Sequence, residues 1–371
     1  MELSTMADKD RNKRREMRKR YLFGFLFVLL FASFSCKSPI GPPPDNTPPG
    51  KRDYVWSIDS VDYGNLPSTI QLESIWGSSA TDVWGAAGDA PDVRDCLWHY
   101  DGAKWSRATE GSPITENTGN KVVYAVWGAA QNNVWAVGRK INQNVLSAFI
   151  MHFDGSQWTD ATPANVALLA SVLYDVFGSA GNNIWVGGDE YALHYDGSKW
   201  TAYKVADSIV VASLSGNGKY VYASTYSPWG SDVRNLYLFS GAGFRQVDRS
   251  TNSVLKFGLI LWAQSDKLMT FTNGVISTRI NGDGTIATAG WVRELTTPTS
   301  LGGVFVQTQK NVFAVGVWNL IYHYNGTDWA QIFIDVPNHA VDPYALFWGV
   351  WTDGNEVFIC DTQNGIVYHG R

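Results

Sequence analysis

The sequence is poor in charged residues and lacks the familiar catalytic motifs. Only 17% of its 371 residues are charged, which argues against extended disorder. It contains no G-x-S-x-G, Walker A, H-E-x-x-H or Cys-x-x-Cys motif. No segment after residue 36 shows helical periodicity. The sequence therefore gives no support for the enzyme classes that these motifs identify, and we predict no cofactor and no catalytic residue. The lack of helical periodicity favours an all-β fold.

The chain also lacks a basic stripe with interleaved aromatic residues. Residues 1–35 hold eight Lys/Arg and four Asp/Glu, so the remainder has 21 basic and 30 acidic residues and a net charge of −9. Phosphate contacts need clustered Lys and Arg. We therefore expect no nucleic-acid partner.

Tryptophan and glycine are abundant, with 17 and 36 residues, and they recur in repeats. Each clear repeat reads as four short strands, as in YAVWG, NNVWAVG, FIMHF and SQWTDA between residues 124 and 161. Four strands at a period of about 45 residues predict a β-propeller. We expect seven four-stranded antiparallel blades in a domain at 54–371, aligned on these pairs: Val83-Trp84, Val134-Trp135, Ile184-Trp185, Val221-Tyr222, Leu268-Met269, Val312-Phe313 and Val357-Phe358.

A motif close to HYDGSKW occurs at 99–105, 152–158, 194–200 and 323–329. Asp-Gly between apolar runs is typical of a two-residue type I′ hairpin, so we expect Leu193 to face Trp200 across the third and fourth strands. Each Trp would then be a wedge between blades. The expected structural positions are Asp101, Gly102, Trp105, Asp154, Gly155, Trp158, Asp196, Gly197, Trp200, Asn325, Gly326 and Trp329.

Five of the six histidines share one position in the repeat: 99, 152, 194, 323 and 369. One copy per blade on an outer strand cannot converge on one metal ion. We predict no metal site and a polar cross-strand role for each, with His194 facing Lys199.

The two ends of the repeat region complement each other. The seventh unit stops after a third strand at 366–369, and Trp56-Ser57 matches Trp105-Ser106 of a fourth strand. We expect the strand at 54–59 to complete the last blade and close the ring.

The first 36 residues have a different character. Residues 9–20 carry eight Lys/Arg, residues 21–34 are an apolar run, and Cys36 follows. The run is shorter than the roughly 20 residues that span a bilayer, which favours a secretory signal at 1–35. An uncleaved anchor and an ordinary secreted protein are the alternatives.

This segment resembles a bacterial lipoprotein signal, although Ser33 stands where that family usually has Leu. The resemblance implies a diacylglyceryl group on Cys36, and Lys37 in place of Asp implies the outer membrane, facing the periplasm or the cell surface. Residues 36–53 are rich in Pro and form a tether. Cys96 and Cys360 could then form a disulfide or remain buried thiols.

The letters VWGAAQNNVWAVG…HFDGSQW resemble a family of bacterial exported propeller repeats, written VWGSS-x-x-DVWAVGD…ILHYDG-x-x-W. The resemblance covers about residues 70–371. The same repeats are more distantly similar to propellers of the photosystem-assembly-factor type. It implies a propeller in the cell envelope and no particular reaction.

Ligand sites in propellers usually lie among the loops that join second to third strands, where loop length varies. An aromatic side chain beside charged groups suits a sugar or a peptide. Trp229 either serves such a site or packs on its own blade. The candidates are Asp92, Arg94, Arg139, Lys140, Tyr226, Trp229, Asp232, Arg234 and Trp318.

The sequence thus predicts a lipid-anchored, monomeric binding or scaffold module for a protein or glycan. A glycan-active hydrolase or lyase and an outer-membrane assembly factor are the alternatives. Carboxylates with an Arg at the channel mouth would favour the enzyme, whereas Ala, Gly and Ser would favour binding.

Overall fold

The computed structural model describes residues 47–371 except 62–69, 89–95, 109–119, 143, 217–219, 230–232, 251–259, 265–266, 273–274 and 281–290. The chain divides into two compact units, Met1–Thr47 and Pro48–Arg371. The predicted signal peptide and Cys36 lie outside the described residues. In the part that is described, no helix is long and apolar enough to cross a bilayer.

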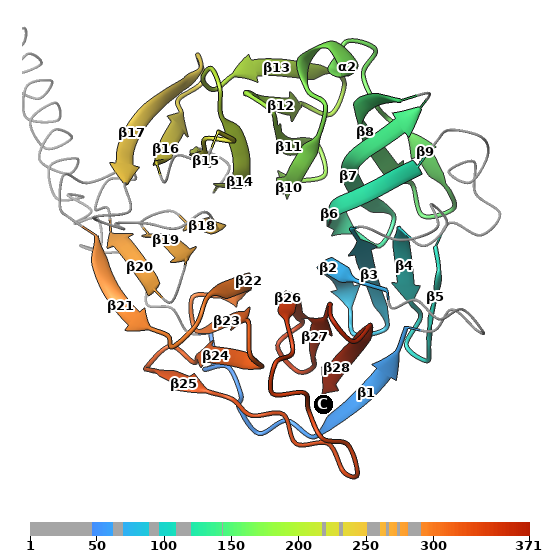
Figure 1. Cartoon of the computed structure of the whole chain (residues 1–371), viewed down its shortest axis with the longest axis vertical. Helices are drawn as coiled ribbons and strands as arrows, with labels where there is room; N and C mark the ends of the chain where they lie inside the picture. Colours follow the sequence, from blue (N-terminus) through green and yellow to red (C-terminus); the bar gives the residue numbers. More distant parts are fainter. Residues whose placement is uncertain are drawn as a thin grey trace, which may run out of the picture. The chain divides into compact units, whose positions relative to one another are not determined.

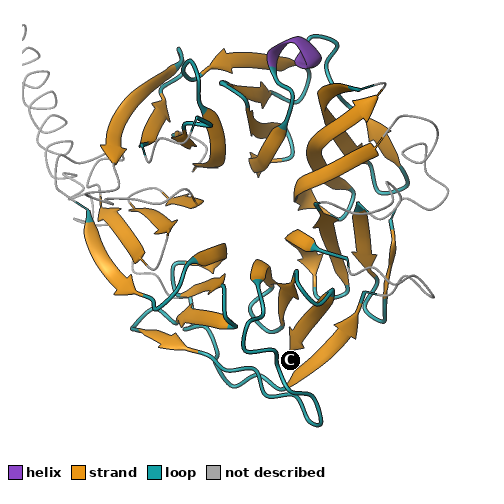
Figure 2. Ribbon diagram, in the orientation of Figure 1, coloured by secondary structure: helices purple, strands orange, loops and turns teal. Residues whose placement is uncertain are grey.

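Within Pro48–Arg371, the described strands form seven four-stranded antiparallel sheets (Figures 1 and 2). Six of them are each built from four consecutive strands. The first comprises β2 (Leu72–Ser79), β3 (Asp82–Ala87), β4 (Leu97–Tyr100) and β5 (Trp105–Arg107). The second comprises β6 (Asn120–Ala130), β7 (Asn133–Asn142), β8 (Val145–Phe153) and β9 (Trp158–Asp160). The third comprises β10 (Leu173–Ala180), β11 (Asn183–Gly188), β12 (Tyr191–Tyr195) and β13 (Trp200–Lys204).

The next three sheets repeat the pattern. The fourth comprises β14 (Val210–Gly216), β15 (Val221–Tyr226), β16 (Arg234–Phe239) and β17 (Phe244–Ser250). The fifth comprises β18 (Ile260–Gln264), β19 (Lys267–Thr272), β20 (Val275–Ile280) and β21 (Val292–Thr296). The sixth comprises β22 (Leu301–Thr308), β23 (Asn311–Gly316), β24 (Leu320–Tyr324) and β25 (Trp329–Gln331). A short helix, α2 (Val166–Leu169), precedes β10.

The remaining sheet combines both ends of the propeller region. Its order is β1 (Trp56–Ser60), β28 (Ile366–Gly370), β27 (Val357–Asp361) and β26 (Phe347–Thr352). Trp56 pairs with Gly370 and Ser60 pairs with Ile366. The segment at 54–59 therefore lies beside the segment at 366–369, as Figure 1 shows.

The first strands of the sheets lie nearest the centre, and each contacts the next in the order β2, β6, β10, β14, β18, β22, β26 and again β2. The core consists of apolar clusters between neighbouring sheets. Trp158 of β9, for example, packs with Trp84 of β3 and Met151 of β8. The predicted all-β propeller of four-stranded antiparallel blades is confirmed.

The recurring Trp-Gly pair has a packing reason. A Cβ on Gly128 would lie 2.4 Å from the ring of Trp76, and a Cβ on Gly178 would lie 2.4 Å from the ring of Trp127. The indole of one innermost strand thus occupies the space that a glycine leaves on the next.

The predicted register of the HYDG hairpins is wrong. Tyr195, not Leu193, pairs with Trp200, and His194 pairs with Thr201. The loop has four residues because the Asp196 carboxylate accepts hydrogen bonds from the N–H groups of Ser198 and Lys199, each at 2.9 Å. An Asp that bonds its own turn in this way does not need the type I′ geometry.

The histidines have a different partner from the predicted one. His194 stacks on Trp185 of the second strand, with ring centroids 4.3 Å apart, and its Nε2 lies 2.7 Å from Oδ1 of Asn183. The same arrangement recurs as Trp84–His99 with Asp82, Trp135–His152 with Asn133, Phe313–His323 with Asn311, and Phe358–His369 with Glu356. Among the described residues no three His, Cys, Asp or Glu side chains gather as metal ligands.

Candidate functional site at the channel mouth

Six innermost strands carry a β-bulge at the same place. In β2 the register skips Glu73, since Leu72 pairs with Ala87 and Ser74 pairs with Ala86. Bulges re-aim side chains and are common beside active sites. The skipped residues in the six strands are Glu73, Tyr124, Tyr174, Ala212, Gly302 and Trp348.

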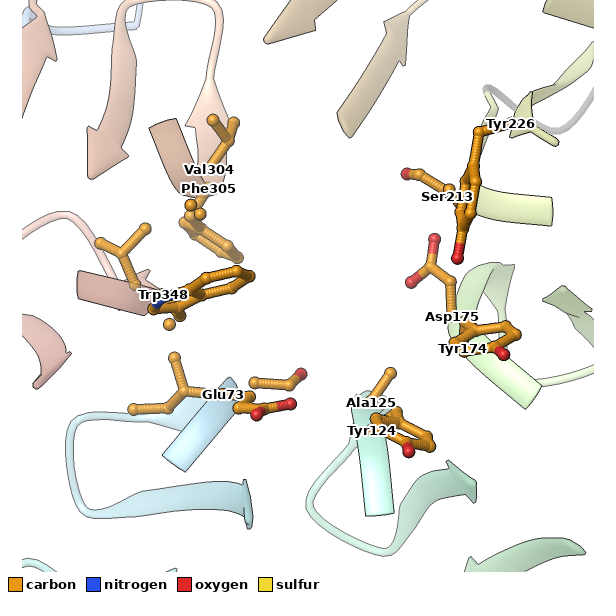
Figure 3. A pocket seen from close by; sticks show the side chains of 17 residues that line it. Glu73, Tyr124, Ala125, Tyr174, Asp175, Ser213, Tyr226, Val304, Phe305 and Trp348 are labelled. Carbon is orange, nitrogen blue, oxygen red and sulfur yellow. The ribbon is translucent and has the colours of Figure 1, made fainter. Parts of the chain in front are cut away.

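All six bulge residues line one cavity of about 360 Å³, and so do the residues that follow them. We call it the mouth cavity; Figure 3 shows its walls. The bulges lie at the N-terminal ends of the innermost strands, next to the connections between sheets. This end, which also bears the second-to-third strand loops, is termed the loop face. The other lining residues are Ser74, Ile75, Ala125, Asp175, Ser213, Tyr226, Gly303, Val304, Phe305, Gly349 and Val350.

Aromatic rings occupy two sides of the mouth cavity. Tyr124 and Tyr174 contact each other with ring centroids 5.6 Å apart, and Figure 3 shows them on the same side as Tyr226. Trp348 and Phe305 face them from the other side, near Glu73. Between the aromatics the wall consists largely of Ala, Gly and Ser, so it is open to an occupant with little steric obstruction.

Asp175 is a buried acid in the wall of the cavity. Its Oδ2 accepts a hydrogen bond from the backbone N–H of Leu214 at 2.7 Å. Burial nevertheless raises the pKa of its carboxyl to about 6, because a low-polarity environment disfavours the charged form. The carboxyl therefore crosses the range from neutral to charged close to physiological pH.

A second cavity, of about 410 Å³, adjoins the first, and Tyr174 and Tyr226 line both. Two further acids, Asp189 and Glu190, line this adjoining cavity together with Trp229. Burial and the nearby negative charge of Asp189 raise the pKa of Tyr174 to about 12, and the same two causes raise the pKa of Tyr226. The two phenols are therefore neutral donors at physiological pH.

Two of the candidates predicted from the sequence line the cavities. Tyr226 lines both cavities, and Trp229 lines the adjoining one with 82% of its surface exposed, so it does not pack on its own blade. The Arg139 guanidinium lies over the Tyr124 ring, 5.8 Å from its centroid.

Three other described candidates do not line either cavity. Lys140 Nζ lies 3.8 Å from Oδ2 of Asp160, and Arg234 begins β16 opposite Tyr226. Trp318 is 61% exposed and holds a left-handed backbone with φ of 62°, which is rare for a bulky residue. Asp92, Arg94 and Asp232 lie outside the described residues.

Sequence reasoning missed the bulge residues. A signal was present in the spacing of the buried positions, because Leu72 and Ile75 are three residues apart and both face inward. Plain strand alternation has a period of two. The same spacing of three occurs at Val123 and Val126, and again at Leu173 and Val176.

Exposed hydrophobic side chains also gather at the loop face. Of the ten large exposed ones among the described residues, eight lie at the hairpin end of β7 and β8, in second-to-third strand loops, in the connection after β25, or in the lining of the mouth cavity. An exposed patch of this kind marks an interaction surface. The eight are Ile141, Val145, Leu146, Trp229, Trp318, Phe333, Tyr344 and Trp348.

Comparison with known proteins supports the fold. No known family and no curated protein matches the sequence. Among solved structures, the chain is similar to YCF48 bound to D1 peptide, with a TM-score of 0.59, 16% identity, and coverage of 87% of this chain and 99% of that one. YCF48 from Cyanidioschyzon merolae gives a TM-score of 0.56, 14% identity and coverage of 85% and 98%. The extracellular domain of the putative one component system BT4673 from B. thetaiotaomicron gives a TM-score of 0.55 and 14% identity. That match covers 85% of this chain and 40% of the other. At these identities the likeness shows a β-propeller fold.

Proposed function

We propose that the protein is a lipid-anchored β-propeller of the bacterial envelope that binds another protein on its loop face. The observation that carries the proposal is the joint location of eight exposed hydrophobic residues and the mouth cavity at one end of the sheets. A sugar would occupy the cavity alone, whereas side chains as far apart in the fold as Phe333 and Trp229 suggest a broader contact. The structure of YCF48 with a D1 peptide is a precedent for peptide binding on this fold.

Two architectural elements belong to the proposal. We take the sheet of β1 and β26–β28 as a seventh blade that closes the ring, with β1 as its fourth strand; the pairing of Trp56 with Gly370 supports this. We take residues 1–35 as the signal, Cys36 as the lipidated residue and Lys37 as the feature that directs the chain to the outer membrane. Cys36→Ala should abolish incorporation of labelled palmitate and release the chain from membranes. Retention of both would contradict the anchor.

A photo-crosslinking phenylalanine analogue tests the docking face. It would replace Trp318 in one full-length variant and Phe333 in another, with Ala103, in the turn at the opposite end of the sheets, as the matched control. We expect a discrete protein adduct from the first two positions in living cells and none from Ala103. Equal adducts from both ends, or a positive glycan array with no adduct, would reject a protein partner.

The glycan-active enzyme has one observation in its favour, since Glu73 and Asp175 share a cavity and the pKa of Asp175 is raised to about 6. A glycosidase needs an acid with a raised pKa and a second carboxylate. The lining, however, holds seven Ala, Gly and Ser residues and, among the described residues, no Arg. This composition favours binding. Hydrolysis of a polysaccharide that Asp175→Asn abolishes would establish the enzyme instead.

A further inference from the structure

The two cavities of the loop face share a chemical character. Glu73 and Asp175 line the mouth cavity, and Asp189 and Glu190 line the adjoining one. Neither lining includes a Lys, Arg or His among the described residues. The shared wall consists of Tyr174 and Tyr226. Acids therefore lie on both sides of a pair of aromatic rings.

Two described cations near this region already have partners. Lys204 Nζ lies 3.4 Å from Oε2 of Glu190 and also bonds Asp207. Arg139 lies over the ring of Tyr124 and not in either lining. Lys204 offsets part of the charge of Glu190, but the four acids still outnumber the described cations around the two cavities. The resulting negative potential attracts cations into a partly enclosed space.

The aromatic lining narrows the choice of cation. Trp348 is 46% exposed at the cavity, opposite Tyr124, Tyr174 and Tyr226 (Figure 3). Rings of Trp and Tyr attract an ammonium or guanidinium over their faces and also accommodate an aliphatic stem. A small inorganic cation would use the carboxylates alone, whereas a Lys or Arg side chain uses both the rings and the acids.

We infer that the mouth cavity receives a basic side chain, Lys or Arg, from the partner segment that docks on the loop face. This inference rests on the proposed function and specifies its ligand class. The ammonium or guanidinium lies between Glu73 and Asp175, its stem crosses Trp348, and the flanking residues of the segment cover the exposed hydrophobic side chains. Tyr174 and Tyr226 offer neutral hydroxyl groups to the same cation or to the backbone of the segment.

Fluorescently labelled tetralysine and its fully Nε-acetylated form provide the test, with the full-length protein in detergent and anisotropy as the readout. Acetylation keeps the stem and removes the charge. We expect tetralysine to bind at least about tenfold more tightly than the acetylated peptide, because a charge-assisted contact in a partly buried site is lost. Glu73→Gln and Asp175→Asn should each weaken binding by about fivefold or more.

Asp335→Asn is the matched control, because it removes one negative charge at an exposed position outside both linings. It should leave the affinity unchanged. Trp348→Ala, a change at a half-exposed side chain, should weaken binding of tetralysine without unfolding the chain. Equal weakening by Asp335→Asn, equal binding of the acetylated peptide, or no binding of tetralysine would overturn the inference. If the loop-face crosslinks still form in that case, the docking proposal stands and only the ligand class is wrong.

Discussion

Nε2 of His323 lies 2.7 Å from Oδ1 of Asn311, and both side chains are buried. Since the amide oxygen can only accept, Nε2 carries the proton and the ring is neutral. Nδ1 accepts from Nε of Arg52 at 3.4 Å. Burial, and next the positive charge of Arg52, lower the pKa of His323 to about 4.

This neutral histidine makes the fold sensitive to acid. The unfolded chain binds a proton near pH 6.5 whereas the folded chain does so only near pH 4, so stability falls as the pH drops through that window. The loss attributable to His323 is about 3 kcal/mol at most. Urea unfolding at about pH 7 and about pH 4.5 should show a smaller difference for His323→Gln than for the parent. The raised pKa of Asp175 makes the fold more stable as the pH falls, but this effect is the same in the parent and in the variant. An equal loss of stability in the two proteins would therefore contradict a neutral, buried His323.

The HYDG turn offers a comparison within the chain. Asp196→Ala removes the acceptor for two N–H groups and should lower the urea midpoint. Asp196→Asn should preserve it, because Asn325 Oδ1 accepts from Thr327 and Asp328 in the equivalent turn. The turn hydrogen bonds lower the pKa of Asp196 to about 2, so its contribution is lost between about pH 4 and pH 2, and the Asn variant should not show this loss. A midpoint equally low in both variants would mean that the carboxylate charge matters more than the hydrogen bonds.

Contact between neighbouring blades can be tested at a glycine. Gly128→Ala places a methyl group 2.4 Å from the Trp76 ring and should cost about 1–3 kcal/mol through overpacking. Gly243→Ala is the control, since nothing lies within 4 Å of its Cβ position; it should be neutral or slightly stabilising. Denaturation of the two variants measures the difference. Similar values for both would show that the indole can move away freely.

The proposed closure of the ring by β1 predicts a large loss of stability when one aromatic side chain is removed. Trp56 is 5% exposed and packs with Phe313, Val357 and Tyr368. Trp56→Ala should reduce the free energy of unfolding by about 3–5 kcal/mol. Its neighbour Val55 is 76% exposed, and Val55→Ala should change stability by less than about 0.5 kcal/mol. If Trp56→Ala were equally mild, β1 would be an appendage of the last sheet.

The sequence predicted the propeller because its repeats are tied to packing. The contact between an indole and a glycine recurs at three junctions of innermost strands, where Trp351, Trp76 and Trp127 lie against Gly77, Gly128 and Gly178. The hairpin register was not predictable from Asp-Gly alone, because the Asp196 side chain competes with the backbone for the turn N–H groups. The mouth cavity was not predicted because its lining depends on the bulges. A bulge adds one residue to the strand, and the type of that residue varies between the repeats, from Glu73 in β2 to Trp348 in β26.

The bulges also separate what folds the chain from what it recognises. Each skipped residue has no partner in the ladder, so most substitutions there should leave the strands paired. Glu, Tyr, Tyr, Ala, Gly and Trp already occupy the six equivalent places. Gly302 is the exception, since a Cβ there would lie 2.6 Å from the Phe347 carbonyl oxygen. Substitution of the other five bulge residues should therefore change what the cavity binds while the sheets stay intact. The same five positions are suitable for a library that selects new ligands.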